Sequence, residues 1–348
     1  MTEPLAVVGA GAAGCGVAYA LREADFDVTI FEKSRGVGGR AATRRRNGCY
    51  YDLGANYIKP ADDRTETLLT SLGTDGLVDI DAPVWTHDAS GQIRRGDREE
   101  AHKWSYETGL TQFAKRLLGE AAATVEKGVE IARLERTADG DWAGWQLFDT
   151  TDTAVGRFET VILTPPAPQT SGILRRSQWI DARRRQLVEA IDAVPYRTIR
   201  SVLLHYPFSI EVPYYALVNG DREHPVGWLS REECKPGHVP DGESLLVVQL
   251  SPAWSEEHYD LPTERAGRRV AQLVAVLLDD SRLADPDWVD TQGWRYALPD
   301  VRVDEETVRS AEDEGLFFAG DWVVGEGRVH AAFWNGVSVG ERVAEGHK

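Results

Sequence analysis

The sequence predicts an α/β fold for the first part of the chain and an α+β fold for a second, smaller domain. The chain has 348 residues, a length that about two domains of roughly 100–200 residues would fill. An apolar run at Leu5–Val8, a helical segment at Cys15–Ala24 and a second apolar run at Val28–Phe31 follow one another. This alternation is typical of strands in a buried parallel sheet. Later strand-like runs and a helix at Thr263–Leu278 predict a separate sheet with helices on one face.

Composition limits the class of protein. Acidic residues number 56 and basic residues 39, which gives a net charge of −17, and mean hydropathy is −0.37. The acidic balance argues against a nucleic-acid partner, because phosphate binding needs a basic face. We find neither an apolar stretch of about 18 residues nor a leader, so no membrane partner is expected and the predicted location is cytoplasmic. Cys15, Cys49 and Cys234 are widely spaced, which predicts a reducing compartment and no zinc site.

The basic residues are 32 arginines and 7 lysines. Acid excess with few lysines is typical of a halophilic protein, in which screening by salt tolerates the repulsion between like charges. An ordinary acidic protein encoded by a GC-rich genome would show the same bias, so both interpretations stay open.

A glycine-rich turn follows the first apolar run. Gly9, Gly11 and Gly14 have the GxGxxG spacing, with Ala12 and Ala13 between them. In a strand-turn-helix context the first glycine permits the tight turn, the second lets backbone approach a pyrophosphate and the third lets helix pack on sheet. The helix N-terminus then supplies N–H groups to the phosphates. The motif predicts a Rossmann-like dinucleotide-binding domain.

Glu32 ends the second apolar run, 18 residues after Gly14. A carboxylate there can accept hydrogen bonds from ribose hydroxyls and would repel a 2′-phosphate. The dinucleotide could still be NAD or FAD. The next segment, Lys33–Thr43, is a glycine-rich loop that contains Gly38-Gly39-Arg40, and it resembles the GGR element of the FAD-dependent amine-oxidase superfamily.

Three further segments carry the same resemblance: Tyr51–Ile58, Leu316–Asp321 and Phe333–Gly340. The resemblance implies FAD as the cofactor, with the last segment opening a helix beside the flavin. Besides the GxGxxG residues, the cofactor-binding residues that it implies are Glu32, Lys33, Gly39, Arg40, Gly54, Ala55, Asn56, Tyr57, Val129, Gly320, Asp321, Phe333 and Gly336.

Within the superfamily the chain is most similar to the renalase-like group. The similarity rests on Asp52–Ile58, Lys235-Pro236-Gly237, Trp254-Ser255 with His258, and Gly293–Ala297. It implies an oxidase that takes hydride from a small electron-rich donor, an isomeric dihydronicotinamide, to flavin N5 and passes electrons to oxygen. The segment Trp322–Val329, with extra glycines, departs from the better-known members.

A flavin performs the redox chemistry itself, so the protein mainly positions the substrate. Trp294, Tyr296 and Trp228 are the expected catalytic-site residues, forming an apolar wall. We find no paired acid and base, no nucleophile elbow and no metal-ligand spacing, so no metal is expected. Lys59 and Lys235 are the candidates for a lysine that contacts flavin N5 through water. Two alternatives remain: an amine oxidase or desaturase-type dehydrogenase, and a flavoprotein without its own catalysis.

The expected domain division is discontinuous. Residues 1–85, 125–168 and 288–348 would form the FAD-binding domain, and residues 86–124 and 169–287 the substrate domain. Over Trp104–Ala123 we also expect an amphipathic helix, with its apolar positions following a turn at Gly109, and we expect a strand over Val129–Leu134. A hairpin of Trp142–Phe148 with Arg157–Phe158 and a buried strand at Thr160–Leu163 follow.

If the charge bias is an adaptation to salt, the melting temperature should rise from low to multimolar KCl. The reason is that the Debye length falls to roughly 3 Å at 1 M salt and screens the repulsion within a chain of charge −17. Thermal unfolding across a KCl series measures this, and a flat or falling curve would favour the genome-composition interpretation.

Overall fold

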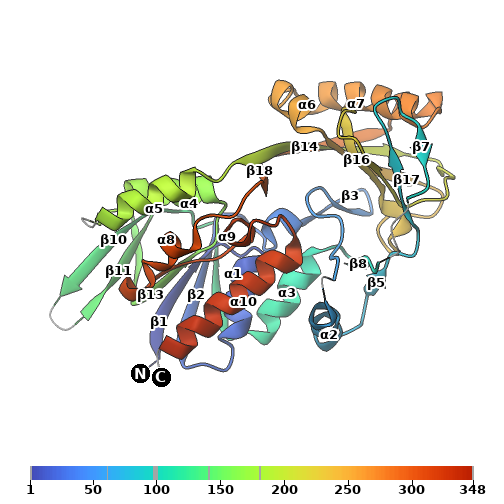
Figure 1. Cartoon of the computed structure of the whole chain (residues 1–348). Coiled ribbons are helices and arrows are strands. Elements are labelled where there is room, and N and C mark those ends of the chain that lie inside the picture. The colour runs from blue at the N-terminus through green and yellow to red at the C-terminus, as the bar shows by residue number, and fades with distance from the viewer. Residues whose placement is uncertain (1, 61, 97–100, 140–141, 180–181, 347–348) are drawn as a thin grey trace. The chain divides into compact units, whose positions relative to one another are not determined.

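The computed structural model describes residues 2–60, 62–96, 101–139, 142–179 and 182–346 (Figure 1). The chain divides into two compact units. The first comprises Met1–Arg40, Phe113–Tyr196 and Leu298–Lys348, and the second Ala41–Gln112 and Arg197–Ala297. Each unit is therefore assembled from segments that are distant in sequence. This division concerns packing, and the functional boundaries expected from the sequence stay a prediction.

A five-stranded parallel sheet forms the centre of the first unit (Figure 1). Its order is β19-β13-β1-β2-β9, and every neighbouring pair is parallel. The strands are β1 (Glu3–Val8), β2 (Phe26–Glu32), β9 (Ala123–Lys127), β13 (Thr160–Leu163) and β19 (Leu316–Phe318). The short apolar runs in the sequence therefore became buried parallel strands, as predicted for a Rossmann-like domain.

Helices α1 (Ala12–Ala20) and α10 (Val329–Gly346) lie side by side in the first unit (Figure 1). Their backbones approach closely at two glycines. A Cβ atom on Gly16 would lie 2.3 Å from the carbonyl oxygen of Phe333, and one on Gly336 would lie 2.1 Å from that of Ala13. Only glycine fits at these contacts.

One face of the parallel sheet packs against a second layer. This layer consists of an antiparallel sheet of β10 (Ile131–Asp139), β11 (Trp142–Asp149) and β12 (Ala154–Phe158), with α4 (Ala167–Arg176) and α5 (Ala182–Asp192). The predicted hairpin is confirmed. The shared core includes Ala6, Val8, Leu134, Leu147, Val161, Leu163, Leu174 and Leu187.

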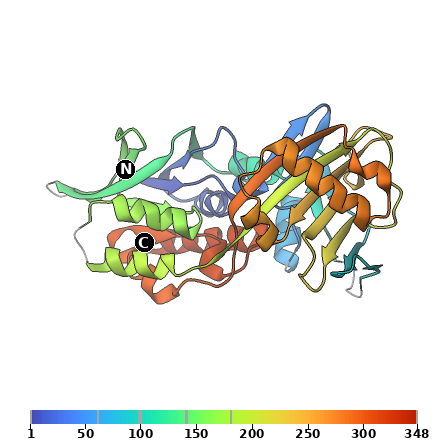
Figure 2. The same cartoon turned by 90° about the horizontal axis from the view of Figure 1, so that it is seen from above.

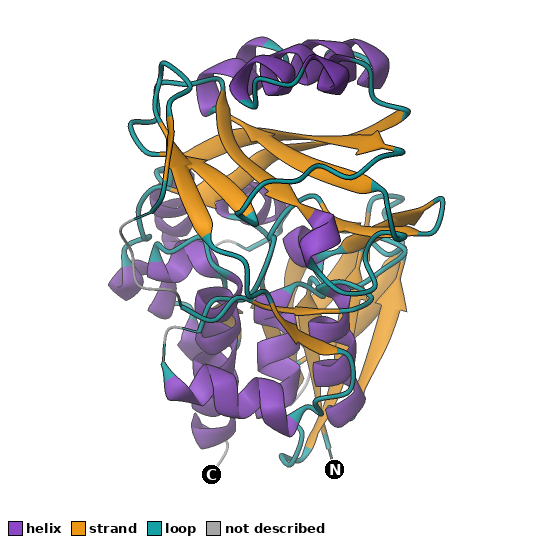
Figure 3. Ribbon diagram, turned by 90° about the vertical axis from the view of Figure 1, so that its right-hand side faces the viewer, coloured by secondary structure: helices purple, strands orange, loops and turns teal. Residues whose placement is uncertain are grey.

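The second unit is built on a seven-stranded sheet of order β18-β14-β17-β16-β15-β6-β7. The strands are β6 (Val84–His87), β7 (Ile93–Arg94), β14 (Tyr196–Tyr206), β15 (Ala216–Asn219), β16 (Val226–Arg231), β17 (Ser244–Leu250) and β18 (Trp288–Pro299). Helices α6 (Pro252–Glu257) and α7 (Thr263–Leu277) lie along one face (Figures 2 and 3). The predicted sheet with helices on one face is therefore confirmed.

The two faces of this sheet follow from the alternation of side chains along β14. Val202 and Leu204 belong to the core under α7. Leu203 belongs to a second core on the opposite face, with Leu53 and Val247. That opposite face carries β3 (Thr43–Arg46) and β4 (Cys49–Asp52), an antiparallel pair. The chain after β4 is thus held against the sheet.

The remaining elements are short. They are α2 (Asp63–Ser71), β5 (Leu77–Asp79) paired with β8 (Trp104–Tyr106), α3 (Thr111–Glu120), α8 (Glu305–Arg309) and α9 (Asp321–Val324), with 3₁₀ turns at Gly39–Ala41, Glu232–Cys234, Ser281–Ala284 and Glu312–Glu314. None of the described helices has the length and apolar character that a membrane crossing requires.

Three predicted boundaries were wrong. The helix expected over Trp104–Ala123 is a strand, β8, followed by α3, because Gly109 has a left-handed φ of 84° and interrupts the segment. The strand expected to begin at Val129 begins at Ile131. The helix expected to open at Phe333 already begins at Val329, so Phe333 lies a full turn inside it.

Candidate functional site

The turn between β1 and α1 is tightly packed except at one glycine. Gly9 has φ 103°, and a Cβ atom there would lie 2.6 Å from Thr164 Oγ1. A Cβ on Gly14 would lie 2.0 Å from the carbonyl oxygen of Gly9. A Cβ on Gly11, in contrast, would meet no atom within 4 Å. Gly11 precedes α1 without a capping side chain, so the first-turn N–H groups are available to an anion.

Glu32 is fixed at the carboxyl end of β2. Its side chain is buried and accepts hydrogen bonds from the backbone N–H of Ala10 at 2.8 Å and of Ser34 at 2.7 Å. Each carboxylate oxygen therefore holds one backbone donor and keeps a second lone pair. The Val129 N–H donates to the carbonyl oxygen of Glu32 at 3.1 Å, so Val129, another of the predicted cofactor-binding residues, lies at the same strand end.

The second glycine-rich loop returns to the first. The Gly38 N–H donates to the carbonyl oxygen of Ala10 at 2.8 Å. A Cβ on Gly39, whose φ is 55°, would lie 3.3 Å from the Cα of Gly11. Lys33 is exposed at the start of this loop. The two loops thus enclose the open position at Gly11.

Arg40 and Asp321 come together although 281 residues separate them. Two guanidinium nitrogens of Arg40 donate to the two carboxylate oxygens of Asp321, each at 2.8 Å. Such a bidentate pair is strong and directional. Asp321 is in the first turn of α9, and the preceding Gly320 N–H donates to Asn335 Oδ1 at 2.8 Å. The predictions missed Asn335, although it lies within the Phe333–Gly340 segment.

In the second unit, four neighbouring strands fasten the segment after β4. The carbonyl oxygen of Leu53 accepts from Ser201 Oγ on β14 at 2.5 Å and from Trp294 Nε1 on β18 at 2.9 Å. The carbonyl oxygen of Gly54 accepts from Gln249 Nε2 on β17 at 2.6 Å. Ser230 Oγ on β16 donates to Asn56 Oδ1 at 3.1 Å. The segment therefore crosses the strands of the sheet in their order.

Aromatic side chains gather at the end of this segment. Tyr57 packs against Tyr215 and Trp228, with ring centroids 6.3 and 6.2 Å apart. Trp294 and Tyr296 lie two residues apart on β18, on one face of the strand. The structure thus ties Trp228 and Trp294 to the Leu53–Tyr57 segment. Their catalytic roles stay predictions.

A buried cluster of charged side chains holds Asp52, where β4 ends. Asp52 Oδ2 and Glu232 Oε1 lie 3.1 and 2.9 Å from Lys235 Nζ, and all three side chains are fully buried. His238 Nδ1 faces Glu232 at 2.9 Å, and its Nε2 faces the carbonyl oxygen of Tyr106 at 2.9 Å. The Lys235 ammonium supplies the positive charge that pairs with both carboxylates. Lys235 is therefore engaged by carboxylates, whereas Lys59, the other candidate, is exposed.

The geometry of the first unit fits FAD. An uncapped helix N-terminus, an open position at Gly11 and a fixed carboxylate at Glu32 suit a pyrophosphate and a ribose that carries no 2′-phosphate. The fold and these residues define a dinucleotide-binding protein.

Comparison with known proteins agrees with this class. A model of an NAD(P)-binding Rossmann-like domain matches residues 7–72, and a model of flavin containing amine oxidoreductases matches residues 78–344. The chain belongs to the flavin-containing amine oxidoreductase family. Membership implies FAD as the cofactor and supports an FAD-dependent oxidoreductase, the class of enzyme that the sequence predicts.

The curated relatives match a short part of the chain, whereas solved structures of the same fold match nearly all of it. Protoporphyrinogen oxidase 2 of Arabidopsis thaliana is 41% identical over 69 residues, which is 20% of this chain and 14% of that protein. Cyclohexylamine oxidase of Brevibacterium oxydans has the same fold, with a TM-score of 0.75 and 15% identity over all of both chains. Reduced UDP-galactopyranose mutase has a TM-score of 0.78 and 11% identity over 99% of this chain and 94% of that chain.

Gly11→Val should abolish FAD retention, because the new side chain would occupy the space that the pyrophosphate needs. The fold should stay intact, because a Cβ atom at this position meets no protein atom within 4 Å. The flavin-to-protein absorbance ratio and circular dichroism measure the two effects. Gly119→Val, at an exposed glycine that also meets nothing within 4 Å, is the matched control and should keep its FAD. Equal FAD content in both variants would refute the role of Gly11. Gly14→Val should fail to fold, because its Cβ meets backbone.

Removal of the Glu232 carboxylate should change stability and its pH dependence. Burial alone would raise the pKa of Glu232, but Lys235 and His238 outweigh burial and lower the pKa. A lowered folded-state pKa gives stability that is present above the unfolded pKa and is lost as pH falls, here below about pH 4.5. Glu232→Gln should therefore lower the free energy of unfolding by about 3–5 kcal/mol at neutral pH. The variant's stability should also fall less steeply than the parent's as the pH is lowered.

Urea unfolding of the FAD-bound protein between about pH 7 and pH 3 tests this prediction. Glu257→Gln, at a side chain that is 77% exposed, is the control and should follow the parent protein. A Glu232→Gln variant with the parent's midpoint and acid slope would show that the cluster contributes no net stability.

Proposed function

We propose that the protein is a renalase-like FAD-dependent oxidase whose substrate is an isomeric dihydronicotinamide or a related electron-rich donor. With FAD bound, its flavin would supply the hydride acceptor for this reaction, and oxygen would be the final electron acceptor. The residues of the first unit that would hold the dinucleotide are those of the glycine loops and Glu32, together with the paired Arg40 and Asp321. The aromatic residues of the second unit orient the substrate ring.

One observation carries the choice of substrate. Trp228 Nε1 and the Tyr215 hydroxyl are buried beside Tyr57 and have no hydrogen-bond partner among the described residues. A buried polar group without a partner costs free energy, so a ligand that pairs with it gains affinity. Indole N–H is only a donor and needs an acceptor. The carboxamide oxygen of a nicotinamide supplies one, whereas an alkylammonium brings donors alone.

The wall around these groups also suits ring stacking. The rings of Trp228, Tyr57 and Tyr215 pack against one another, with centroids 6.2–6.3 Å apart. Burial raises the pKa of the Tyr215 hydroxyl above its ordinary value, so this hydroxyl stays neutral. Hydride transfer needs close, aligned approach of two rings more than a strong base. Neutral aromatic residues meet that need.

Oxidation of an amine is the second candidate. The matched family model is that of amine oxidoreductases, and a solved structure with the same fold is a cyclohexylamine oxidase. A neutral amine could present its substituent to the same aromatic wall. The two candidate substrates differ in one group: a dihydronicotinamide carries a carboxamide oxygen that could accept a hydrogen bond from Trp228, and a simple amine carries no such oxygen.

Anaerobic mixing distinguishes them. Isomeric dihydronicotinamides, reduced at ring positions other than the usual one, should bleach the flavin rapidly, and ordinary NADH should react poorly. Admitted oxygen should restore the colour and yield hydrogen peroxide and oxidised nicotinamide. Faster bleaching by monoamines or polyamines would establish the second candidate. No bleaching by either class would contradict both.

Trp228→Phe should raise the substrate concentration that gives half-maximal flavin reduction by about tenfold, because it removes one hydrogen bond of about 1–1.5 kcal/mol. The aromatic ring and the bound FAD should remain. Stopped-flow reduction measures the change, with Trp254→Phe, a substitution of a half-buried residue in α6, as the control. If Trp228→Phe and the parent reach half-maximal flavin reduction at the same substrate concentration, Trp228 does not contact the substrate.

A further inference from the structure

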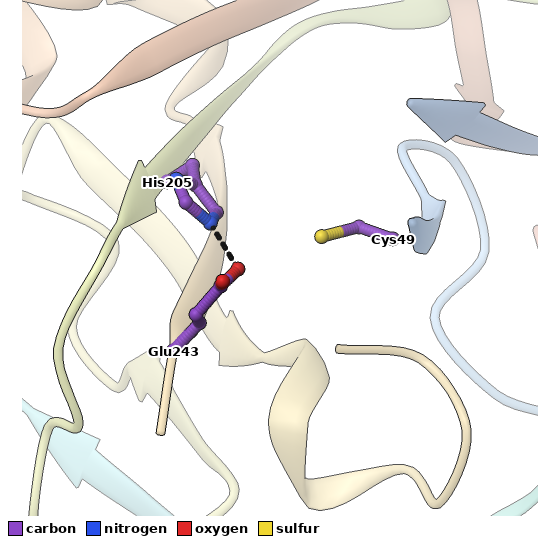
Figure 4. Close-up of side chains that lie close together, drawn as sticks. All are labelled: Cys49, His205 and Glu243. Carbon is purple, nitrogen blue, oxygen red and sulfur yellow. Dashed lines mark hydrogen bonds and ion pairs between the residues drawn. The ribbon is translucent and has the colours of Figure 1, made fainter. Parts of the chain in front are cut away.

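Three possible metal-ligating side chains meet on the sheet face opposite α7 (Figure 4). Cys49 lies on β4, His205 on β14 and Glu243 immediately before β17. Their Sγ, imidazole nitrogen and carboxylate oxygen all lie within 4.8 Å of one another, and His205 Nε2 lies 2.8 Å from Glu243 Oε2. The sequence predicted no metal site, because at least 38 residues separate any two of these ligands.

The imidazole of His205 is held in a fixed orientation. It stacks on Trp288, with ring centroids 5.0 Å apart and planes at 17°. Its Nδ1 is buried and makes no hydrogen bond among the described residues, but the Asp287 carboxylate lies 3.4 Å away. A metal-ligating histidine usually directs its second nitrogen to a carboxylate, which fixes the tautomer and raises ligand basicity. Asp287 is placed for that role, with Nε2 facing Glu243 and Cys49.

The ligand set indicates which metal fits. Thiolate, imidazole and carboxylate together are ligands of Zn²⁺, whereas Mg²⁺ and Ca²⁺ prefer oxygen alone. Zinc bond lengths of about 2.0–2.3 Å in a tetrahedron place ligand atoms roughly 3.3–3.7 Å apart. The distance between His205 Nε2 and Glu243 Oε2, now 2.8 Å, would lengthen by about half an ångström. Cys49 Sγ lies within 4.8 Å of the other two ligand atoms and would move toward them by at most about 1 Å.

A competing role for the cysteine is a nucleophile activated by His205. Cys49 Sγ donates to the carbonyl oxygen of Asn47 at 3.9 Å, and His205 Nε2 pairs with Glu243 Oε2 at 2.8 Å, so the imidazole nitrogen that would activate the thiol is already engaged by the carboxylate. Cys49 itself is fully buried, and Glu243, with a side chain 34% exposed, is the part of the cluster that meets solvent. The cluster therefore offers an entry for an ion and no nucleophile.

We infer that Cys49, His205 and Glu243 form a zinc site, with water as the fourth ligand at the exposed Glu243 side and Asp287 supporting His205. When Zn²⁺ binds, the Cys49 S–H bond breaks, the sulfur–zinc bond forms and the proton passes to solvent; no electron is transferred. The ion joins β4, β14 and the start of β17, so it stabilises the face that carries the Leu53–Tyr57 segment.

Zinc binding by the FAD-bound protein tests the inference. After chelator treatment and dialysis against Zn²⁺, elemental analysis should give one zinc ion per chain, and an indicator dye should record the released proton. Cys49→Ser should weaken zinc binding at least about tenfold. Cys234→Ser, at a half-buried cysteine outside the cluster, is the matched control and should bind as the parent does. Parent protein without stoichiometric zinc, or Cys49→Ser with the parent's affinity, overturns the site.

Two measurements keep the test decisive if Cys49→Ser folds poorly. Glu243→Gln alters a partly exposed side chain and should fold, with zinc affinity reduced by about tenfold. Co²⁺ in place of Zn²⁺ should give the d–d absorption of a tetrahedral ion at wavelengths beyond the flavin bands. That absorption should be lost in His205→Gln; unchanged spectra in both variants would show that the metal binds elsewhere.

Discussion

The first unit depends on a close approach of backbone to backbone around the start of α1. Gly14 brings the helix against the carbonyl of Gly9, and Gly336 brings α10 against Ala13. A side chain at Gly14 would force α1 away from the end of β1, and a side chain at Gly336 would force α10 away from α1. Because the helix is seated so closely, its uncapped N-terminus and the Glu32 carboxylate lie at the same strand ends. The open position at Gly11 exists only because its neighbours are packed this tightly.

The second unit positions its segment after β4 by a different means. Asp52 is held by Lys235, and also accepts hydrogen bonds from Thr43 Oγ1 and the Leu110 N–H at 2.6 and 3.2 Å. Buried charges of this kind are costly unless they are paired, so the pairing strongly disfavours any shift of β4. The chain that leaves Asp52 is then fixed residue by residue by the sheet beneath it.

Much of this arrangement could be predicted from local sequence. The strand at Thr160–Leu163 was predicted at its observed limits, because four apolar residues before a proline-rich turn leave few other structures. Gly9 and Gly14 were assigned their roles in the turn from spacing alone. These predictions succeeded because each depends on neighbours in the chain.

The rest could not be predicted, because it depends on contacts between distant residues. Nothing near Lys235 in sequence shows that Asp52 is its partner, and the pairing of Cys49 with His205 depends on the alternation of β14 across a sheet. The start of α10 was misplaced because Val329–Ala332 has no marked start signal, such as a capping residue followed by proline. Ser230 and Gln249 look like ordinary strand residues until the segment that they fasten is placed over them.

The fastening of that segment has a consequence for how its sequence can change. Three of the four sheet side chains bind main-chain carbonyls, those of Leu53 and Gly54. A carbonyl is present whatever the residue, so replacement of Leu53 or Ala55 removes none of these three bonds, whereas replacement of Ser201, Gln249 or Trp294 does. A substitution at Ala55 therefore leaves these three bonds in place, whereas Leu53 is also part of a buried core and Asn56 accepts the fourth bond through its own side chain. Ala55, whose side chain takes no part in these three bonds, is therefore the position in the segment where a new side chain would disturb the fastening least.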